Sequence, residues 1–184
     1  MKAVYEAIER TIGKEGKYSD NPHDAGGKTM WGITENVARK NGYTGDMRNL
    51  PRSTAVAIYA NEYFIAPRFS DIVPLSSSIA EELFDTGVNM GVSIPGQFLQ
   101  RALNVLNMSH KNTPLFEKLV VDGKIGPATI RALETFLKLR GKEGEVVMLT
   151  MLNSLQGVRY IELCERREAN KEFIYGWFRH RVVI

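Results

Sequence analysis

Residues 15–34 read EGKYSDNPHDAGGKTMWGIT, and their composition differs sharply from what precedes them. Before this stretch, apolar residues recur at helical spacing over residues 2–14 and predict an amphipathic helix that Gly16 ends. The stretch itself places Pro and Gly among Asp, Asn and Thr, and it closes on the more apolar residues 29–33. This pattern predicts a turn-rich loop with short strand character.

Two carboxyl groups of this stretch stand in unlike surroundings. Glu15 continues the apolar stripe of Ile8 and Ile12, where lost hydration raises the pKa of a carboxyl, as a general acid near neutral pH requires. Asp24 lies among glycines and polar residues, where water and backbone N–H groups keep a carboxylate charged. Such a pair suits glycoside hydrolysis. Spacing alone leaves the ordinary alternatives open, a solvated Glu at a helix end and an Asp that forms a turn.

The stretch as a whole favours the catalytic interpretation. It closely resembles the signature of the glycoside hydrolase family 108 muramidases, in which Glu-Gly-x-Tyr leads through Asp-x-Gly-Gly-x-Thr to a Gly-Ile-Thr ending. The one departure is Lys17, where the family often has a second Gly, and it removes no reacting group. The resemblance implies a lysozyme-like helical fold, with Glu15 as the acid, Asp24 as the second carboxylate and Thr29 as a helper.

Thr29 also has a physical rationale as part of such a site. A hydroxyl beside a carboxylate can hold a water molecule through one donated and one accepted hydrogen bond, which favours an inverting mechanism. A retaining enzyme would hold its two carboxyls closer together, and their separation is not encoded in the spacing. Both stereochemical outcomes therefore stay open at this point.

Neighbouring aromatic and polar side chains are candidates for substrate binding. Tyr18 and Trp31 flank the carboxyl pair and could stack on sugar rings, although core packing explains them equally well. Asp85 and Asn89 are four residues apart and share a helix face. We expect a structural role for Asp85, and we include Asn89 among the substrate-binding candidates, with capping of a buried network as its alternative.

The remaining sequence predicts further helices, so the expected fold class is mainly α. The predicted helices span 53–66 with Ser53 as cap, 79 to Gly87 or Gly91, 93–106 with Pro95 just inside, 128–140 ended by Gly141, and 145–169. Residues 107–121 predict a loop. The aromatic tail over residues 173–184 is expected to dock on the body, because exposed aromatics at that density would be a liability.

The C-terminal half resembles the small helical peptidoglycan-binding region that follows the catalytic part in the same muramidase family. The stretches that carry this likeness are GVSIPGQFLQRALNVLN, VDGKIGPATIRAL and FIYGWFRHRV. A structural explanation stands beside it, since Asp122-Gly123 makes a turn and Gly126-Pro127 sets up a helix start. We predict a lysozyme-like catalytic domain over residues 1–91, packed against a helical peptidoglycan-binding region over residues 92–184.

Composition indicates a folded protein that meets an anionic partner. Of the 184 residues, 43% are hydrophobic and 24% charged, with a formal net charge of +3. The basic residues are interleaved with acids and form no block with aromatics, so peptidoglycan is the expected partner and nucleic acid is not. The single Cys164 lies in an apolar helical stretch and is expected in the core.

The sequence also predicts where the protein acts. No apolar run is long enough to span a membrane, and the N-terminus alternates charged with apolar residues, so neither membrane insertion nor a signal peptide is expected. We expect a monomer that is made in the bacterial cytoplasm and acts on periplasmic peptidoglycan, with a holin or similar factor for passage. The family includes phage endolysins and muramidases that edit the wall for secretion, and both roles stay open.

Other kinds of site are set aside on their residues. Gly27-Lys28-Thr29 lacks the first Gly of a phosphate-binding loop, because Pro22 holds that place. A calcium loop from Asp20 would carry Trp31 where the bidentate Glu belongs, and the three histidines are too scattered for zinc. No cofactor or metal is expected.

The leading hypothesis is therefore a muramidase that hydrolyses the β-1,4 bond between N-acetylmuramic acid and N-acetylglucosamine. Its chemical rival is a lytic transglycosylase, which needs one Glu and leaves an anhydro sugar. A third hypothesis is a non-catalytic wall-binding accessory of secretion. The joint presence of Glu15, Asp24 and Thr29 argues against lost catalysis.

Overall fold

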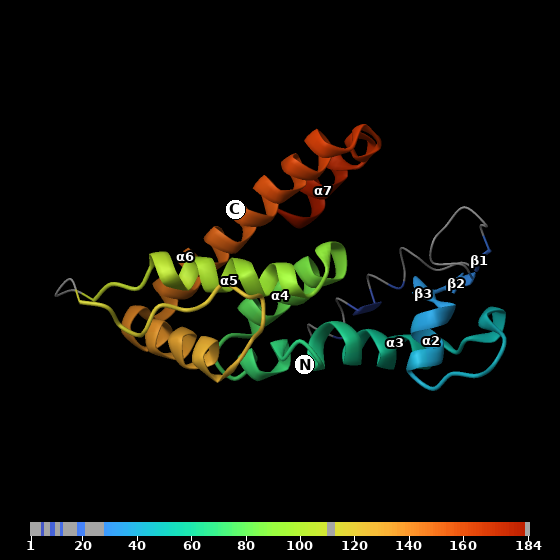
Figure 1. The fold of residues 1–184 in the computed structure, drawn as a ribbon, viewed down its shortest axis with the longest axis horizontal. Coiled ribbons are helices and arrows are strands. Elements are labelled where there is room, and N and C mark those ends of the chain that lie inside the picture. The colour runs from blue at the N-terminus through green and yellow to red at the C-terminus, as the bar shows by residue number, and fades with distance from the viewer. Residues whose placement is uncertain are drawn as a thin grey trace. The chain divides into compact units, whose positions relative to one another are not determined.

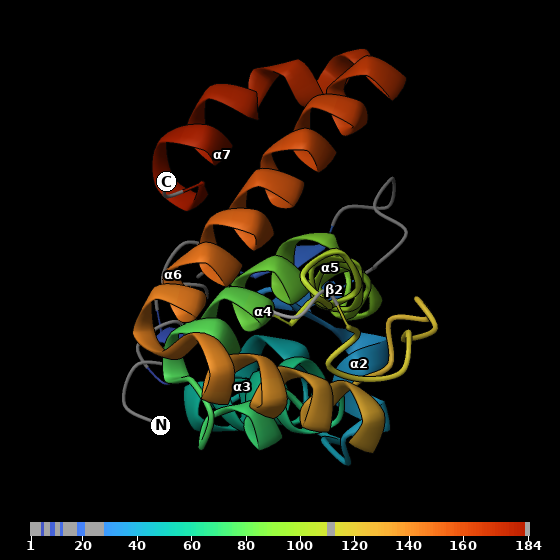
Figure 2. The ribbon, with the colours of Figure 1, turned by 90° about the vertical axis from the view of Figure 1, so that its left-hand side faces the viewer.

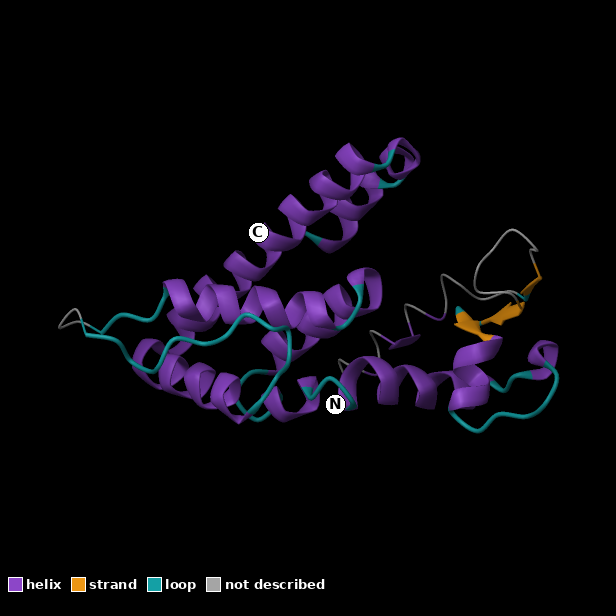
Figure 3. Ribbon diagram, in the orientation of Figure 1, coloured by secondary structure: helices purple, strands orange, loops and turns teal. Residues whose placement is uncertain are grey.

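The chain forms two compact units, Met1–Ala66 and Pro67–Ile184. The computed structural model describes residues 5, 8, 9, 12, 18–20, 28–109 and 113–182. Helices make up most of the described chain, and its strands belong to the first unit (Figure 3), so the mainly α fold class is confirmed. The predicted boundary between residues 91 and 92 falls inside the second unit and stays a prediction about the functional regions.

The first unit begins with residues of the predicted N-terminal helix. Its described members, residues 5, 8, 9 and 12, are helical. Ile8 and Ile12 are buried, whereas Tyr5 is half exposed, so the inner face predicted from apolar spacing is the covered one. Glu9 forms an ion pair with Arg52, which connects this segment to the start of the helix α3 (Arg52–Ala60).

A small antiparallel sheet follows, with strand order β1 (Ser19–Asp20), β2 (Lys28–Met30) and β3 (Ile33–Thr34). These strands, near the blue end of the chain in Figure 1, confirm the strand character predicted for this stretch. Trp31 and Gly32 form the two-residue turn between β2 and β3, and both have positive φ, 56° and 75°. Tight hairpin turns favour that backbone, because its twist matches that of the paired strands.

Short helices complete the first unit. Thr34 caps α2 (Glu35–Lys40) through its side chain, and the 3₁₀ segment η1 (Met47–Asn49) leads to α3, which continues as the π-helical η2 (Asn61–Ile65). The predicted cap at Ser53 is wrong. Pro51 holds the N-cap position in an extended conformation, φ −62° and ψ 139°, so the helix starts at Arg52 and Ser53 lies in its first turn.

The second unit is built on three helices, α4 (Ser77–Met90), α5 (Ser93–Val105) and α6 (Pro127–Arg166), which pack against one another. The 3₁₀ segment η3 (Phe69–Ile72) precedes α4, and the Ser76 hydroxyl caps α4 by accepting a hydrogen bond from the Ile79 N–H at 3.0 Å. The core takes its large apolar side chains from all of these elements. They include Phe69, Ile79, Leu83, Phe84, Leu99, Leu103, Leu133, Phe136 and Leu152.

Gly141 interrupts α6 as the sequence predicts. Its φ of 58° and ψ of −145° are not helical, and Figure 2 shows that the chain changes direction between the two helical segments. A residue with a side chain seldom adopts this backbone, whereas Gly does so without a steric penalty. The helices predicted over residues 128–140 and 145–169 thus correspond to the two segments of α6.

The loop residues 113–126 are held against α5 by side-chain amides on one face of that helix. Gln100 Nε2 donates to Asp122 Oδ1 at 2.8 Å, and Gln100 Oε1 accepts from the Gly123 N–H at 2.8 Å. Asn104 exchanges two hydrogen bonds, each 2.8 Å long, with the backbone of Leu119. The Asp122-Gly123 turn therefore has a structural role in this loop, as one of the two interpretations proposed.

The C-terminal tail docks on α6, which confirms the prediction for residues 173–184 within its described part. The segments η4 (Glu168–Glu172) and α7 (Ile174–Arg181) fold back alongside α6 (Figure 2), and the Trp177 ring stacks on Tyr160 at 4.7 Å between centroids. Cys164 is buried within α6, as expected. Tyr175 is 75% exposed, so docking does not cover every aromatic of the tail. None of the described helices is long and apolar enough to cross a membrane.

Candidate active site

The structure describes some of the predicted site residues and leaves out others. Glu15 and Asp24 lie outside the described residues, so their placement stays a prediction. Thr29 lies on β2, Trp31 lies in the turn after it and Tyr18 directly precedes β1, whereas Asn89 belongs to α4 of the second unit. The structure therefore brings three of the six candidates together on one small element.

Thr29 occupies the central strand of the sheet. Its Cα partners are Ser19 on β1 and Thr34 on β3, and side chains of directly opposed residues lie on the same face of a sheet. Three hydroxyl-bearing residues thus form a row across the sheet, with Thr29 half-buried at its centre. Ser19 was not predicted, because only the strand register reveals that it is opposite Thr29.

Residues 21–27, which include Asp24, join the paired ends of β1 and β2. The Cα partners Asp20 and Lys28 are the last described residues on either side of this segment. Asp24 therefore belongs to the connection between the two strands that carry Ser19 and Thr29. Ser19 and Thr29 of the hydroxyl row thus lie on the same two strands that the segment with Asp24 connects in the sequence.

Tyr18 is held by two polar neighbours. Its hydroxyl donates a hydrogen bond to Asp20 Oδ2 at 3.1 Å, and the Arg48 guanidinium lies over its ring, 5.1 Å from the centroid. Partial burial is the main cause that raises the pKa of Tyr18, and the hydrogen bond to the negatively charged Asp20 raises it further. Arg48, on η1, was not predicted as a neighbour, and it occupies one face of the ring that a sugar could have used.

Trp31 has a clear structural attachment. Its indole Nε1 donates a hydrogen bond to the Leu50 carbonyl oxygen at 2.9 Å, although its φ of 56° is one that bulky residues seldom adopt. The bond connects the hairpin turn to the segment that follows η1 and helps to hold the strained turn in place. Stacking of the Trp31 ring on a sugar stays a prediction.

Trp31→Phe is expected to lower the free energy of unfolding by about 1–2 kcal/mol, because a smaller aromatic ring replaces the indole and the Leu50 carbonyl loses its donor. Denaturant unfolding at fixed pH measures this loss. Tyr43→Phe, which removes an exposed hydrogen bond to the Asp46 carbonyl, is the comparison and should cost less. Equal stability of Trp31→Phe and wild type would contradict a structural role for the indole N–H.

Asn89 and Asp85 differ in their contacts. Asp85 Oδ1 accepts a hydrogen bond at 2.8 Å from Arg181 in an ion pair that connects α4 to α7, which is the structural role expected of it. Asn89 is exposed, and its side-chain amide donates to the Asp85 carbonyl oxygen at 2.7 Å, within its own helix. This bond leaves the amide oxygen directed away from that contact, and sugar binding by Asn89 stays a prediction.

A buried polar cluster between α4 and α6 was missed in the sequence. Thr86 donates to Glu82 Oε1 at 3.3 Å and accepts from Gln156 Nε2 at 2.9 Å. Burial, and then the negative charge of Asp85, raise the pKa of Glu82 to about 7. The available signal was the position of Glu82, three residues after the buried Ile79 and one before the buried Leu83.

Glu82 is expected to make stability depend on pH. Between the ordinary value of 4.5 and about 7, the unfolded chain has lost the proton that the folded protein keeps, so stability falls as the pH rises through this window. Above about pH 7 the folded protein bears the full free-energy cost of a charged Glu82. Glu82→Gln should therefore raise the free energy of unfolding by about 2 kcal/mol at pH 8 and change it little at pH 4.

Unfolding of wild type and Glu82→Gln across this pH range measures the effect. Glu81→Gln is the matched control, because Glu81 is the neighbouring carboxylate on α4 and takes no part in the hydrogen bonds of this cluster. It should retain the pH dependence of wild type. An unchanged pH dependence in Glu82→Gln would contradict the assignment.

The described residues offer no ready metal site. Among them, no three His, Cys, Asp or Glu side chains lie together as metal ligands would. The chemistry available on the described part of the first unit is that of hydroxyls, an aromatic ring and a guanidinium, beside the segment that carries Asp24.

Comparison with known proteins divides the chain into two regions. Residues 8–91 match the family model described as glycosyl hydrolase 108, and residues 94–182 match that of a predicted peptidoglycan domain. The structure of Brucella abortus SagA is similar, with a TM-score of 0.64 and 20% sequence identity over 96% of this chain and 88% of that chain. At this identity the likeness concerns the fold. No curated protein matches the chain.

Proposed function

Because the chain belongs to the glycosyl hydrolase 108 family and continues into a peptidoglycan domain, we propose that it is a muramidase. In this proposal it hydrolyses the β-1,4 bond between N-acetylmuramic acid and N-acetylglucosamine. The observation that carries it is the family match over residues 8–91, since this region includes the whole stretch 15–34 with its two carboxyls and Thr29.

Burial in the first unit supports Glu15 as the general acid. Ile8 is 2% exposed and Ile12 is fully buried, so the helix face with which Glu15 shares its sequence spacing is the covered one. A carboxyl at the edge of such a face is poorly hydrated and keeps its proton to a higher pH. Glu15 would then donate that proton to the glycosidic oxygen as the C1–O bond of N-acetylmuramic acid breaks.

The hydroxyl row supports a water-activating role for Asp24 and Thr29. Thr29 can orient a water molecule by a hydrogen bond, and Asp24 would accept the proton of that water as its oxygen attacks C1. The attack comes from the face opposite the leaving group, so the configuration at C1 inverts. The water proton ends on Asp24, and the proton of Glu15 ends on the released N-acetylglucosamine hydroxyl.

Product analysis of digested murein tests the reaction. We expect reducing N-acetylmuramic acid ends by mass spectrometry, and the inverted α-anomer should be the first product seen by NMR before mutarotation. Anhydromuramic ends would instead identify a lytic transglycosylase. Initial release of the β-anomer would refute inversion and leave hydrolysis standing. Murein that is bound but not cut would favour a non-catalytic accessory.

The setting of the reaction is part of the same proposal. The protein acts as a monomer on periplasmic peptidoglycan, in phage lysis or in wall editing for secretion, with a holin or similar factor opening the route. Expression in a bacterial cytoplasm should therefore lyse cells only after the inner membrane is permeabilised. Lysis at the same rate without permeabilisation would remove the need for a passage factor.

A further inference from the structure

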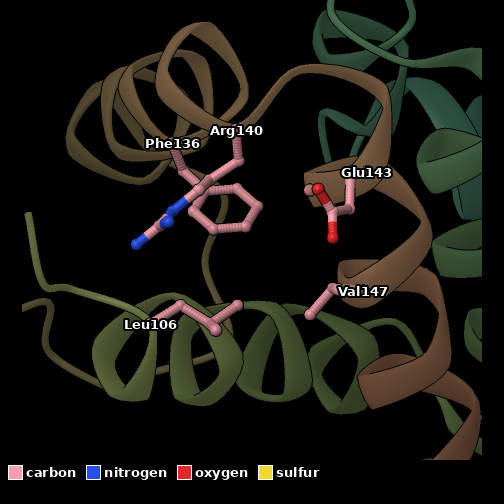
Figure 4. Close-up of a pocket in the computed structure, with 6 residues that line it drawn as sticks. Leu106, Phe136, Arg140, Glu143 and Val147 are labelled. Atoms are coloured by element: carbon pink, nitrogen blue, oxygen red, sulfur yellow. The ribbon is translucent and has the colours of Figure 1, made fainter. Parts of the chain in front are cut away.

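Two hollows lie along the helix pair α5 and α6 in the second unit. At one end is a pocket of about 200 Å³ (Figure 4), lined by Leu106, Phe136, Arg140, Glu143, Gly144 and Val147. A second pocket, of about 240 Å³, is lined by Arg101, Ala102, Val105, Met151, Ser154 and Leu155. From the first pocket to the second, the residue numbers of the lining residues rise along α6 and fall along α5. Both pockets therefore lie on one antiparallel pair of helices. We call them together the α5–α6 groove.

Arg140 and Glu143 carry opposite charges at the first pocket, but they do not form an ion pair with each other. In an unbroken helix, Arg140 and Glu143 would be neighbours and would form an ion pair. The break at Gly141 separates them, and Figure 4 shows their side chains on opposite sides of the Phe136 ring. Arg140 donates to the Met108 carbonyl oxygen at 3.2 Å, whereas Glu143 has no hydrogen bond or ion pair with any residue that the structure describes.

Apolar side chains line the groove without being covered. Val105 is 72% exposed and Val147 is 41% exposed, although both flank the packed helices. Exposed apolar surface that is gathered along a groove and bordered by charges is typical of a binding site. Gly144 allows the close packing at the first pocket, because a Cβ atom there would overlap Arg140 and would lie 3.3 Å from the Phe136 ring.

The dimensions and the chemistry of the groove favour a short peptide. From residue 144 to 155, α6 rises about 16 Å, which is the length of about five extended residues. Sugars usually bind against exposed aromatic rings, but the one aromatic among the lining residues, Phe136, is only 2% exposed. Aliphatic walls with a carboxylate and guanidinium groups match small apolar side chains, a free ammonium group and free carboxylates.

We propose that the α5–α6 groove binds the peptide stems of peptidoglycan, with Glu143 pairing with a stem ammonium group and Arg140 or Arg101 pairing with a stem carboxylate. The choice of peptidoglycan as the polymer rests on the proposed function. The peptide preference rests on the groove itself, and its test needs no catalysis.

NMR titration of the intact, ¹⁵N-labelled protein tests the site. The probe is the synthetic tetrapeptide L-Ala–γ-D-Glu–meso-diaminopimelate–D-Ala, and the comparison ligand is chitotetraose, a glycan without peptide. The tetrapeptide should shift the amide signals of Val105, Leu106, Val147 and Met151, and chitotetraose should not. Tetrapeptide shifts elsewhere, groove shifts with chitotetraose, or no shift at millimolar tetrapeptide would each overturn the proposal.

Paired variants separate the contacts from general effects. Glu143→Gln should weaken tetrapeptide binding about fivefold, whereas Glu165→Gln, an exposed carboxylate farther along α6, should not. Val147→Asp should also weaken binding, and Val158→Asp, on α6 outside the lining residues, should leave it unchanged. Equal effects within either pair would overturn the assignment. A groove covered by a second copy, seen as a dimer that Val147→Asp dissociates, would do the same.

Murein digestion by the same proteins distinguishes this proposal from the proposed function. Tetrapeptide binding in the groove without reducing muramic ends would refute muramidase activity and leave the groove assignment in place. Reducing muramic ends without tetrapeptide binding would refute the groove assignment alone.

Discussion

Glu15→Gln is expected to reduce the turnover of murein by about 10³-fold while the protein still folds and binds murein. Glutamine has nearly the same shape as the protonated carboxyl but cannot give up a proton to the glycosidic oxygen. The leaving group would then depart as an alkoxide, and the barrier rises by the lost acid catalysis. The release of soluble muropeptides from purified murein measures turnover, and co-sedimentation with murein measures binding.

Glu35→Gln is the matched control for this experiment. Glu35 is at the start of α2, half-buried and paired with Arg39, and no role in the site is assigned to it. Its loss should leave turnover within about twofold of wild type. Wild-type turnover by Glu15→Gln would show that Glu15 is not the acid, whatever the fate of the other site residues.

Gly96→Ala is expected to lower the free energy of unfolding by at least about 3 kcal/mol. Gly96 lies in the first turns of α5, and a Cβ atom there would overlap the carbonyl oxygen of Gly123. That carbonyl is part of the turn whose N–H is fixed by Gln100, so the backbone cannot move away without losing this hydrogen bond. Chemical denaturation of both proteins measures the difference.

Gly176→Ala, in the same unit, is expected to raise the free energy of unfolding. Gly176 is within α7, and no atom lies within 4 Å of where its Cβ would be. Alanine should stabilise this helix by about 0.5–1 kcal/mol, because it has the higher helix propensity. If both substitutions had the same effect, the close approach of α5 to the Gly123 turn would not be the cause.

Local patterns predicted much of the fold. Apolar spacing located the helices of the second unit, and Gly141 was identified as their interruption because Gly tolerates a non-helical backbone. The prediction of Ser53 as the cap was wrong because Pro51, two residues earlier, holds the N-cap position in an extended conformation. The stretch 15–34 predicted the family, which the match over residues 8–91 confirms.

Contacts between distant segments were out of reach of such patterns. Arg48 is near Tyr18 only because η1 packs beside the sheet, and Ser19 is opposite Thr29 only through the register of β1 and β2. Neither relation has a fixed spacing in the chain. Ser19 and Arg48, the two neighbours of the candidate site that were not predicted, are both of this kind.

Neighbouring residues were enough to predict the helical class, the position of the helix break and the residue types of the proposed catalytic site, because each depends on local sequence. Which polar groups lose water depends instead on packing between distant segments. Glu82 loses water because α4 packs against α6, where Gln156, far along the chain, donates to Thr86 and Thr86 donates to Glu82. Hydration and pairing depend on what folding brings together, and that is a property of the packed molecule.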